Sequence, residues 1–325
     1  MGHDGGTGRE AGPMKIAAAR DFHDLVAERA AAIRSDIEWA LSDASGGWTA
    51  PPEGSDAIVY AGTAYTESFV DDMLSIAPPK WAHTEDAGID GRFYDGMRAS
   101  GVPVTHSPGA NAPEVAELAF AGLMWGAKRL GELRGQQEAH KWGKLMLPGL
   151  SATTVLIVGL GNIGGLVAQY AKAFGMTVHG IRRSPDPVAN VDRQGTLADL
   201  AGFLPDADFV VLALPIADDT AGMIDRAALA AMKETAVLVN VGRGALVDID
   251  ALRDALGSGG IASAFLDVLP VEPWPADSDL WDVPNLFITP HNGSLSPLYA
   301  VRVGELWLEN LKRFTAGEPL LHRAF

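Results

Sequence analysis

The segment "TTVLIVGLGNIGGLVAQYAKAF" (153–174) gives the clearest indication of the fold. It opens with a continuously apolar run, which is typical of a strand covered on both faces of its sheet, and ends in a segment with helical composition. Between them lies a G-x-G-x-x-G pattern, which is weak evidence alone in a chain with 37 glycines. A strand before the glycines and a helix after them favour dinucleotide binding over a turn without a ligand, since such glycines let the backbone approach a pyrophosphate. The residues predicted to take part are Gly159, Gly161, Asn162, Ile163 and Gly164.

Further apolar segments alternate with helical ones through the second half of the chain. Helices are predicted at 163–174 and 226–232. The predicted strands are 153–159, 176–181, 208–215, 235–242, 261–268 and 286–290. This alternation predicts an α/β fold with a doubly wound parallel (Rossmann) sheet, whose ligands lie at the carboxyl ends of the strands.

The segments outside this sheet predict a second, smaller α/β unit. Its predicted strands and helices are 56–62, 66–76, 79–85 and 89–99. A helix at 113–134 has Pro113 in its first turn, and a C-terminal helix at 298–314 should pack back on the smaller unit. The predicted dinucleotide-binding domain, 113–297, is therefore inserted in a discontinuous substrate domain made of 1–112 and 298–325. Residues 1–14 are expected to be a disordered leader.

Composition limits the classes of partner. The formal net charge is −16, which argues against nucleic acid and anionic membrane, because both are bound through basic patches. There is no cysteine, so a disulfide framework, a thiolate zinc site and a cysteine nucleophile are excluded. No apolar run approaches the roughly 20 residues of a membrane span, and the N-terminus lacks the pattern of a secretory signal. We expect a cytoplasmic protein whose anionic ligands, if any, are bound by local cations.

The end of the second strand predicts the cofactor. An NAD site has an acidic residue there, which binds the ribose hydroxyls. Here the strand is followed by Arg182, Arg183 and Ser184, which suit a 2′-phosphate, so we predict NADP with NAD possible. The alternative is that both arginines are solvated and Asp186 binds the ribose.

Three charged residues follow later strands of the predicted sheet, namely Arg243, Glu272 and His291. Because the carboxyl ends of parallel strands share one edge, we expect them to converge. An arginine can bind a substrate carboxylate in a fork, and an imidazole can move the proton that accompanies hydride transfer to a carbonyl. A carboxylate beside the imidazole favours its protonated form. Each residue alone could equally be an ordinary loop or surface group.

Five segments together resemble the D-isomer-specific 2-hydroxyacid dehydrogenases. They are "GLGNIGGLVAQYAKAFGM" (159–176), "LPIADDTAGMID" (214–225), "NVGRGALVD" (240–248), "AFLDVLPVEP" (264–273) and "LWDVPNLFITPHNG" (280–293). The family's catalytic arginine, glutamate and histidine fall on Arg243, Glu272 and His291. The resemblance implies cofactor contacts at Leu214, Pro215, Thr220, Val241, Gly242, Asp267 and Gly293, of which Asp267 matches the position that contacts the nicotinamide carboxamide. "DAGID" (86–90) resembles the loop that binds the substrate carboxylate, which makes Ala87 and Gly88 substrate-binding candidates.

The resemblance also implies a substrate and an assembly. It implies an oxidoreductase acting on a small anionic 2-keto or 2-hydroxy acid, with glyoxylate and hydroxypyruvate as the expected substrates. The region near "HKWGK" (140–144) often belongs to a dimerisation arm, so a homodimer is expected. Trp274 departs from the common family residue and either shapes the pocket or fills the core. The alternative function is a dinucleotide-binding sensor, like the corepressors that resemble these enzymes. Formate dehydrogenase is set aside, because "ITPHNG" (288–293) lacks the glutamine that would precede its histidine.

Overall fold

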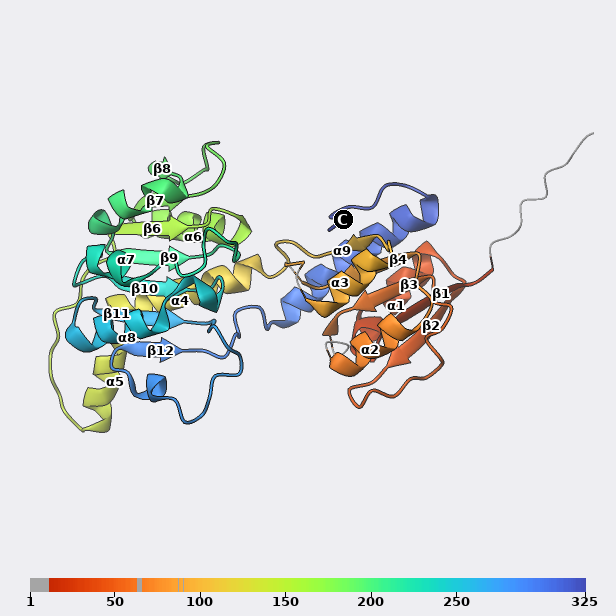
Figure 1. Cartoon of the computed structure of the whole chain (residues 1–325), viewed down its shortest axis with the longest axis horizontal. Helices are drawn as coiled ribbons and strands as arrows, with labels where there is room; N and C mark the ends of the chain where they lie inside the picture. Colours follow the sequence, from red (N-terminus) through yellow and green to blue (C-terminus); the bar gives the residue numbers. More distant parts are fainter. Residues whose placement is uncertain (1–11, 63–65, 87, 90) are drawn as a thin grey trace, which may run out of the picture. The chain divides into compact units, whose positions relative to one another are not determined.

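The computed structural model describes residues 12–62, 66–86, 88–89 and 91–325. Two compact units are present, each built from a parallel sheet with helices (Figure 1). One unit runs to Ala110 and includes Ser296–Phe325, while the other is Asn111–Leu295. The divisions lie two residues before the predicted boundaries at 112 and 297. The α/β class with an inserted parallel sheet is confirmed.

The larger unit carries a seven-stranded parallel sheet. Its order is β12 (Leu286–Ile288), β11 (Ser263–Leu266), β10 (Val237–Asn240), β9 (Phe209–Leu212), β6 (Thr154–Val158), β7 (Thr177–Ile181) and β8 (Arg193–Gly195). Six of these strands lie inside the predicted ranges. The seventh, β8, was not predicted, because "RQG" is too short and polar to give an apolar pattern. The strand order reverses at β6, so the loop after β6 lies at the switch point where ligands of such sheets bind.

Helices cover both faces of this sheet, which explains why its strands are apolar throughout. Consecutive β10 residues Leu238 and Val239 belong to separate cores on the two faces, and both are fully buried. The two helices α4 (Ala112–Ala127) and α6 (Asn162–Ala173) pack on one core. The two helices α7 (Arg226–Ala231) and α8 (Ile249–Ser258) pack on the other. Short 3₁₀ helices are η2 (Leu197–Gly202), η3 (Leu204–Asp206), η4 (Gly244–Leu246) and η5 (Asp279–Asp282).

The single helix predicted at 113–134 is in fact two helices. The chain leaves α4 at Lys128, and Arg129 takes a left-handed conformation with φ of 48°. A second helix, α5 (Leu130–Glu138), then begins. The composition stays helical across the break, so the pattern alone could not locate it.

The smaller unit contains a five-stranded parallel sheet. Its order is β2 (Ile37–Ser42), β1 (Met14–Ala19), β3 (Ala57–Tyr60), β4 (Trp81–Thr84) and β5 (Val104–Thr105). Its helices are α1 (Arg20–Ile33), α2 (Glu67–Ser75), α3 (Arg92–Ala99) and α9 (Pro297–Ala316). Trp307 of α9 is fully buried against α1, where its ring meets Phe22 edge-on, so the C-terminal helix completes this unit as predicted.

The prediction that residues 1–14 are disordered is wrong at its C-terminal end, because β1 already begins at Met14. Residues 1–11 of the leader lie outside the described residues.

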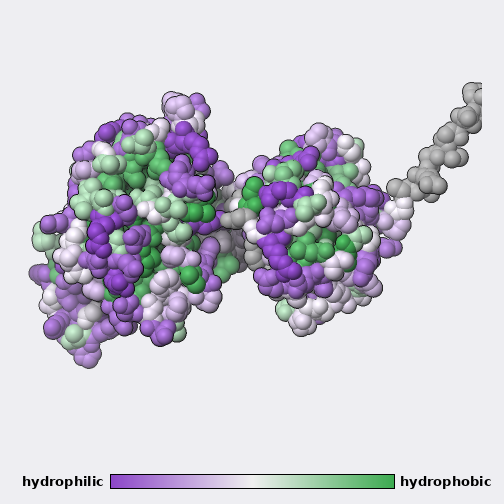
Figure 2. Space-filling model, viewed as in Figure 1, coloured by the Kyte–Doolittle hydropathy of each residue, from purple (hydrophilic) through white to green (hydrophobic). Residues whose placement is uncertain are grey.

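Hydrophilic residues are spread over both units in the space-filling view (Figure 2). Within the described part of the chain, no helix is long and apolar enough to cross a membrane. The segment after α5 exposes Trp142 almost completely, with 97% of its surface accessible.

Candidate active site

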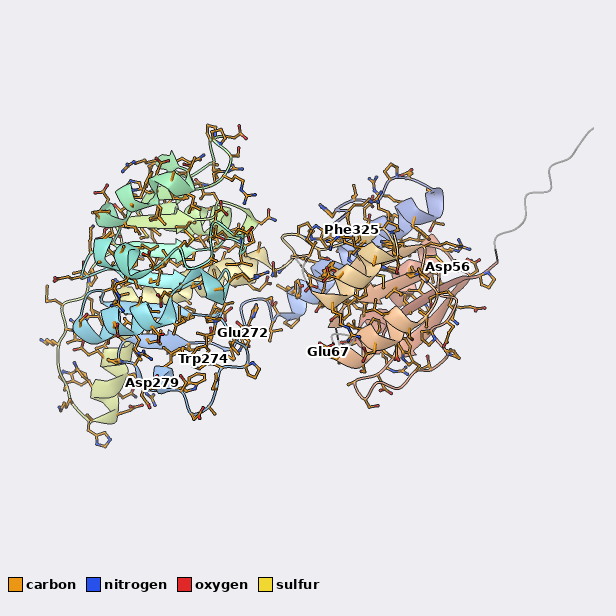
Figure 3. The ribbon with its side chains drawn as sticks, in the orientation of Figure 1. Asp56, Glu67, Glu272, Trp274, Asp279 and Phe325 are labelled. Carbon is orange, nitrogen blue, oxygen red and sulfur yellow. The ribbon has the colours of Figure 1, made fainter. Side chains whose placement is uncertain are left out.

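The carboxyl ends of β10, β11 and β12 bring three predicted residues together. Arg243, Glu272 and His291 line one open pocket of about 240 Å³ in the larger unit. The rest of its wall is formed by Ile216, Gly244, Ala245, Val268, Leu269 and Pro270. Figure 3 shows Glu272 and Trp274 on the loop that leaves β11. The convergence predicted from the strand order therefore occurs.

The imidazole of His291 is paired with the carboxylate of Glu272. Its Nδ1 lies 2.7 Å from Glu272 Oε2, and Glu272 Oε1 accepts a hydrogen bond from the Leu269 amide at 2.8 Å. An ionised carboxylate only accepts hydrogen bonds, so Nδ1 must carry a proton. The second ring nitrogen, Nε2, makes no hydrogen bond with the described residues, and about half of the side chain is exposed (51%). Nε2 is thus the atom that can exchange a proton with a ligand.

The loop that carries His291 is held by the buried carboxylate of Asp267, which is only 3% exposed. Its Oδ1 accepts hydrogen bonds from Thr289 Oγ1 at 2.6 Å and the Asn292 amide at 2.9 Å, and its Oδ2 accepts one from the Gly293 amide at 3.1 Å. The Asp267 carbonyl accepts the His291 amide at 2.9 Å. His291 has a φ of 54°, which is uncommon for a residue with a side chain and needs such support.

The loop that carries Arg243 is held by the fully buried amide side chain of Asn240. Asn240 Nδ2 donates to the Arg243 carbonyl at 2.9 Å, and Oδ1 accepts the Gly242 amide at 3.0 Å. A Cβ on Gly244 would lie 1.9 Å from the Leu269 carbonyl carbon. Gly244 therefore lets this loop pack against the backbone of the Glu272 loop, which brings Arg243 and Glu272 together.

The glycine loop after β6 has the geometry expected of a pyrophosphate site. Gly159 has a φ of 100°, and a Cβ on Gly164 would lie 1.9 Å from the Gly159 carbonyl oxygen, so both positions exclude a side chain. A Cβ on Gly161 would meet no atom within 4 Å, so the space in front of it is open. Asn162 and Ile163 form the first turn of α6, where backbone amides have no intrahelical acceptor. The residues present therefore fit a bound dinucleotide phosphate.

The loop after β7 presents two cationic side chains. Arg183 is exposed and has no hydrogen-bond or ion-pair partner among the described residues. Arg182 Nη1 reaches only the Asp186 carbonyl, at 3.4 Å. The Asp186 carboxylate, the candidate for a ribose-binding acid, accepts the Ser184 hydroxyl instead.

The remaining predicted residues occupy varied positions. Leu214 and Pro215 follow β9 at the switch point. Thr220 is buried, and its Oγ accepts the Ala217 amide at 2.7 Å, so its side chain shapes the turn after β9. Val241 is buried, which leaves only its backbone for a ligand.

The two substrate-loop candidates belong to the smaller unit. Ala87 lies outside the described residues, while Gly88 is described in a bend. The segment before them is anchored, because Asp86 accepts the Tyr94 hydroxyl at 2.8 Å and its carbonyl accepts the Ser107 amide at 2.9 Å. Burial raises the pKa of the neighbouring Glu85 carboxyl to about 7.

Comparisons with known proteins identify relatives of this chain. The family described as D-isomer specific 2-hydroxyacid dehydrogenase, NAD binding domain, matches residues 120–293. A glyoxylate reductase from Thermococcus litoralis is 34% identical over 287 residues, which cover 83% of this chain and 86% of that protein. The chain belongs to the D-isomer specific 2-hydroxyacid dehydrogenase family.

Two further members extend the comparison. A D-3-phosphoglycerate dehydrogenase from Mycobacterium leprae is 34% identical, but the match covers 83% of this chain and only 51% of that protein. The crystal structure of an NADPH-dependent glyoxylate/hydroxypyruvate reductase from Sinorhizobium meliloti, in complex with NADP and sulfate, has a TM-score of 0.80 at 25% identity. It covers 96% of this chain and 98% of that one. The chain, as a member of this family, is accordingly an oxidoreductase that transfers a hydride with an NAD(P) cofactor. These comparisons do not support the alternative function of a dinucleotide-binding sensor.

Sequence reasoning missed the residues that hold the loops of this dehydrogenase site. Asn240 and Gly244 carry no charge, and the only available signal was their place beside Arg243 at a strand end. Trp274 packs against the core of the larger unit, in keeping with its core-filling interpretation.

Proposed function

We propose that the protein is an NADPH-dependent reductase of small 2-keto acids, with glyoxylate and hydroxypyruvate as the best candidates. The observation that carries this proposal is the pairing of His291 with Glu272, at 2.7 Å, in the same pocket as Arg243. The pocket is small, and Arg243 is the one cation of fixed charge in its described lining, which suits a substrate with one carboxylate. The names of the relatives from Thermococcus litoralis and Sinorhizobium meliloti support the same substrate class.

Each polar residue of the pocket has a role in reduction. The guanidinium of Arg243 binds the substrate carboxylate and so orients the neighbouring carbonyl. The bound nicotinamide supplies the hydride that the carbonyl carbon accepts. Protonated His291 donates the Nε2 proton to the carbonyl oxygen, which completes the hydroxyl group of the product. Glu272 holds Nδ1 and stabilises the imidazolium before the proton leaves.

The cofactor preference follows from the loop after β7. The 2′-phosphate of NADPH is bound by Arg182 and by Arg183, which is unpaired among the described residues. The carboxylate of Asp186 meanwhile accepts a hydrogen bond from the Ser184 hydroxyl. A ribose with a free 2′-hydroxyl leaves both guanidinium groups without an anion. We therefore propose preference for NADPH, with NADH as a weaker substitute.

We also propose a homodimer. The exposed side chains of Trp142 and Met146 lie in the segment that the family resemblance assigns to a dimerisation arm. Sedimentation equilibrium of the purified chain tests this assembly. The cytoplasmic location stays a prediction, which fractionation of the source cells would test.

The decisive experiment measures NADPH and NADH oxidation with glyoxylate, hydroxypyruvate, pyruvate and a bulky aryl 2-keto acid. Arg243→Ala should raise KM for the keto acid steeply and lower turnover, while NADPH binding changes little. His291→Ala should abolish the proton step. Arg226→Ala is the matched control, because it removes an exposed arginine of α7 that pairs with Asp254. Tight NADPH binding without turnover on any keto acid, or full activity of Arg243→Ala, would refute the proposal.

A further inference from the structure

The loop Arg182–Val188 contains no helix or strand. It follows β7, which lies next to the edge strand β8, and its prolines, Pro185 and Pro187, have no N–H to donate. Its arginines carry the proposed contacts to the 2′-phosphate. A loop that must present two cations at one anion binds it more tightly when its shape is set beforehand, since less conformational entropy is lost on binding.

One side chain of the neighbouring strand spans this loop. Gln194 Nε2 donates to the Asp186 carbonyl at 2.9 Å and to the Ser184 carbonyl at 3.4 Å. Its Oε1 accepts the Val188 amide at 3.2 Å. A single amide therefore meets backbone groups of three alternate residues of the loop, using both its donor and its acceptor side.

The strand that carries Gln194 is itself anchored. Gln194 pairs in register with Gly180 of β7, and the Arg182 amide donates to the Gly195 carbonyl at 3.1 Å. At the other end of β8, the Asp192 carboxylate accepts the Val178 amide at 2.7 Å. Because β8 is anchored to β7, the side chain of Gln194 holds the loop in a defined position relative to the edge of the sheet.

The same contacts set the positions of the charged groups. The Asp186 carbonyl that Gln194 binds is also the acceptor of Arg182 Nη1. The Ser184 hydroxyl donates to the Asp186 carboxylate, and the Asp186 amide returns a hydrogen bond to Ser184 Oγ at 3.2 Å. The carboxylate of Asp186, the one acid of the loop, is therefore hydrogen-bonded to Ser184. The positive charges of the two neighbouring arginines stay available to a phosphate.

We propose that Gln194 is a positioning residue for cofactor choice, which holds the Arg182–Val188 loop in the shape that binds a 2′-phosphate. The inference rests on the proposed preference for NADPH. It differs from that proposal in assigning discrimination to a residue whose side-chain hydrogen bonds all go to the loop.

The test compares binding of NADP⁺ and NAD⁺ by isothermal titration calorimetry, with kcat/KM for NADPH and NADH measured alongside. Gln194→Met keeps the length of the side chain and removes all three hydrogen bonds. We expect its Kd for NADP⁺ to rise about 10-fold, which corresponds to about 1.4 kcal/mol, while the Kd for NAD⁺ changes less than 2-fold. Gln194→Glu should show a larger loss, because its carboxylate faces two carbonyl oxygens and adds negative charge beside the phosphate.

The ratio of the two dissociation constants separates positioning from general damage, since a misfolded protein loses both cofactors equally. Gln169→Met is the matched control, because Gln169 is exposed on α6 and has no hydrogen-bond partner among the described residues. Two failures are distinguishable. If the unmodified protein binds NAD⁺ as tightly as NADP⁺, the proposed cofactor preference is wrong and this inference is overturned with it. If the unmodified protein prefers NADP⁺ and Arg183→Ala removes the preference, but Gln194→Met retains it, only the role of Gln194 is refuted.

Discussion

Asn240→Asp keeps the shape of a buried side chain and removes one hydrogen-bond donor. The carboxylate can still accept the Gly242 amide, now 3.0 Å from Oδ1, but its other oxygen faces the Arg243 carbonyl oxygen, now 2.9 Å from Nδ2. Two oxygens cannot share a hydrogen bond without an added proton. The lost bond and the buried charge together should cost about 1–3 kcal/mol of the free energy of unfolding.

The same change should affect substrate binding more specifically. The Arg243 carbonyl moves away from the carboxylate, and the guanidinium moves with it. Loss of one hydrogen bond in a guanidinium–carboxylate fork, about 1.5–3 kcal/mol, raises KM for the keto acid about 10- to 100-fold. KM for NADPH should change little, because the glycine loop after β6 and the Arg182–Val188 loop are untouched.

Asn310 of α9 offers a matched control. It is also fully buried, and its amide binds the Leu321 carbonyl at 3.1 Å and the Leu321 amide at 2.7 Å. Asn310→Asp should therefore lose similar stability in thermal unfolding and keep the KM for the keto acid. The assay is steady-state kinetics with the keto acid and NADPH varied in turn. If Asn240→Asp loses stability but binds the keto acid as tightly as the unmodified protein, the positioning argument fails.

Two further predictions concern the packing of one loop and one partly buried carboxyl. Gly244→Ala should lower stability by about 1–3 kcal/mol and reduce turnover, because its Cβ would lie 1.9 Å from the Leu269 carbonyl carbon. Gly257→Ala, in open space on α8, should be neutral or stabilising, and equal thermal unfolding of both variants would contradict this reasoning. Glu85→Gln should increase the free energy of unfolding by about 2–3 kcal/mol above pH 7 and change it little below pH 4.5. Burial raises the pKa of the Glu85 carboxyl from 4.5 to about 7. The folded protein therefore loses stability as the pH rises from 4.5 to 7, and the glutamine variant avoids this loss because it carries no charge. Urea unfolding at pH 4.5 and pH 8 measures this difference, and an equal gain at both values would refute it.

Much of the larger unit could be predicted because its signals are local. A buried parallel strand is an unbroken apolar run, and a glycine loop needs small residues at fixed spacing, so both can be identified without knowing what packs against them. The convergence of Arg243, Glu272 and His291 also followed, because each comes after a strand of one parallel sheet. The strand β8 escaped prediction, since three polar residues at a sheet edge have no hydrophobic pattern. The break between α4 and α5 escaped for the opposite reason, because helical composition continues across it.

From the sequence alone one can predict the order of strands, glycines and helices along the chain, and the chemical character of the residues at the strand ends. The neutral side chains that hold those ends in place are visible only in the folded protein. Asn240 binds Arg243 three residues away, but Gln194 meets Ser184, Asp186 and Val188 only because β8 pairs with β7. Gly244 must be small only because the Leu269 backbone, in the loop after the neighbouring strand β11, lies against it. The physical reason is that a buried hydrogen bond or a close backbone contact depends on which strands become neighbours, and the local pattern of residues does not encode that choice.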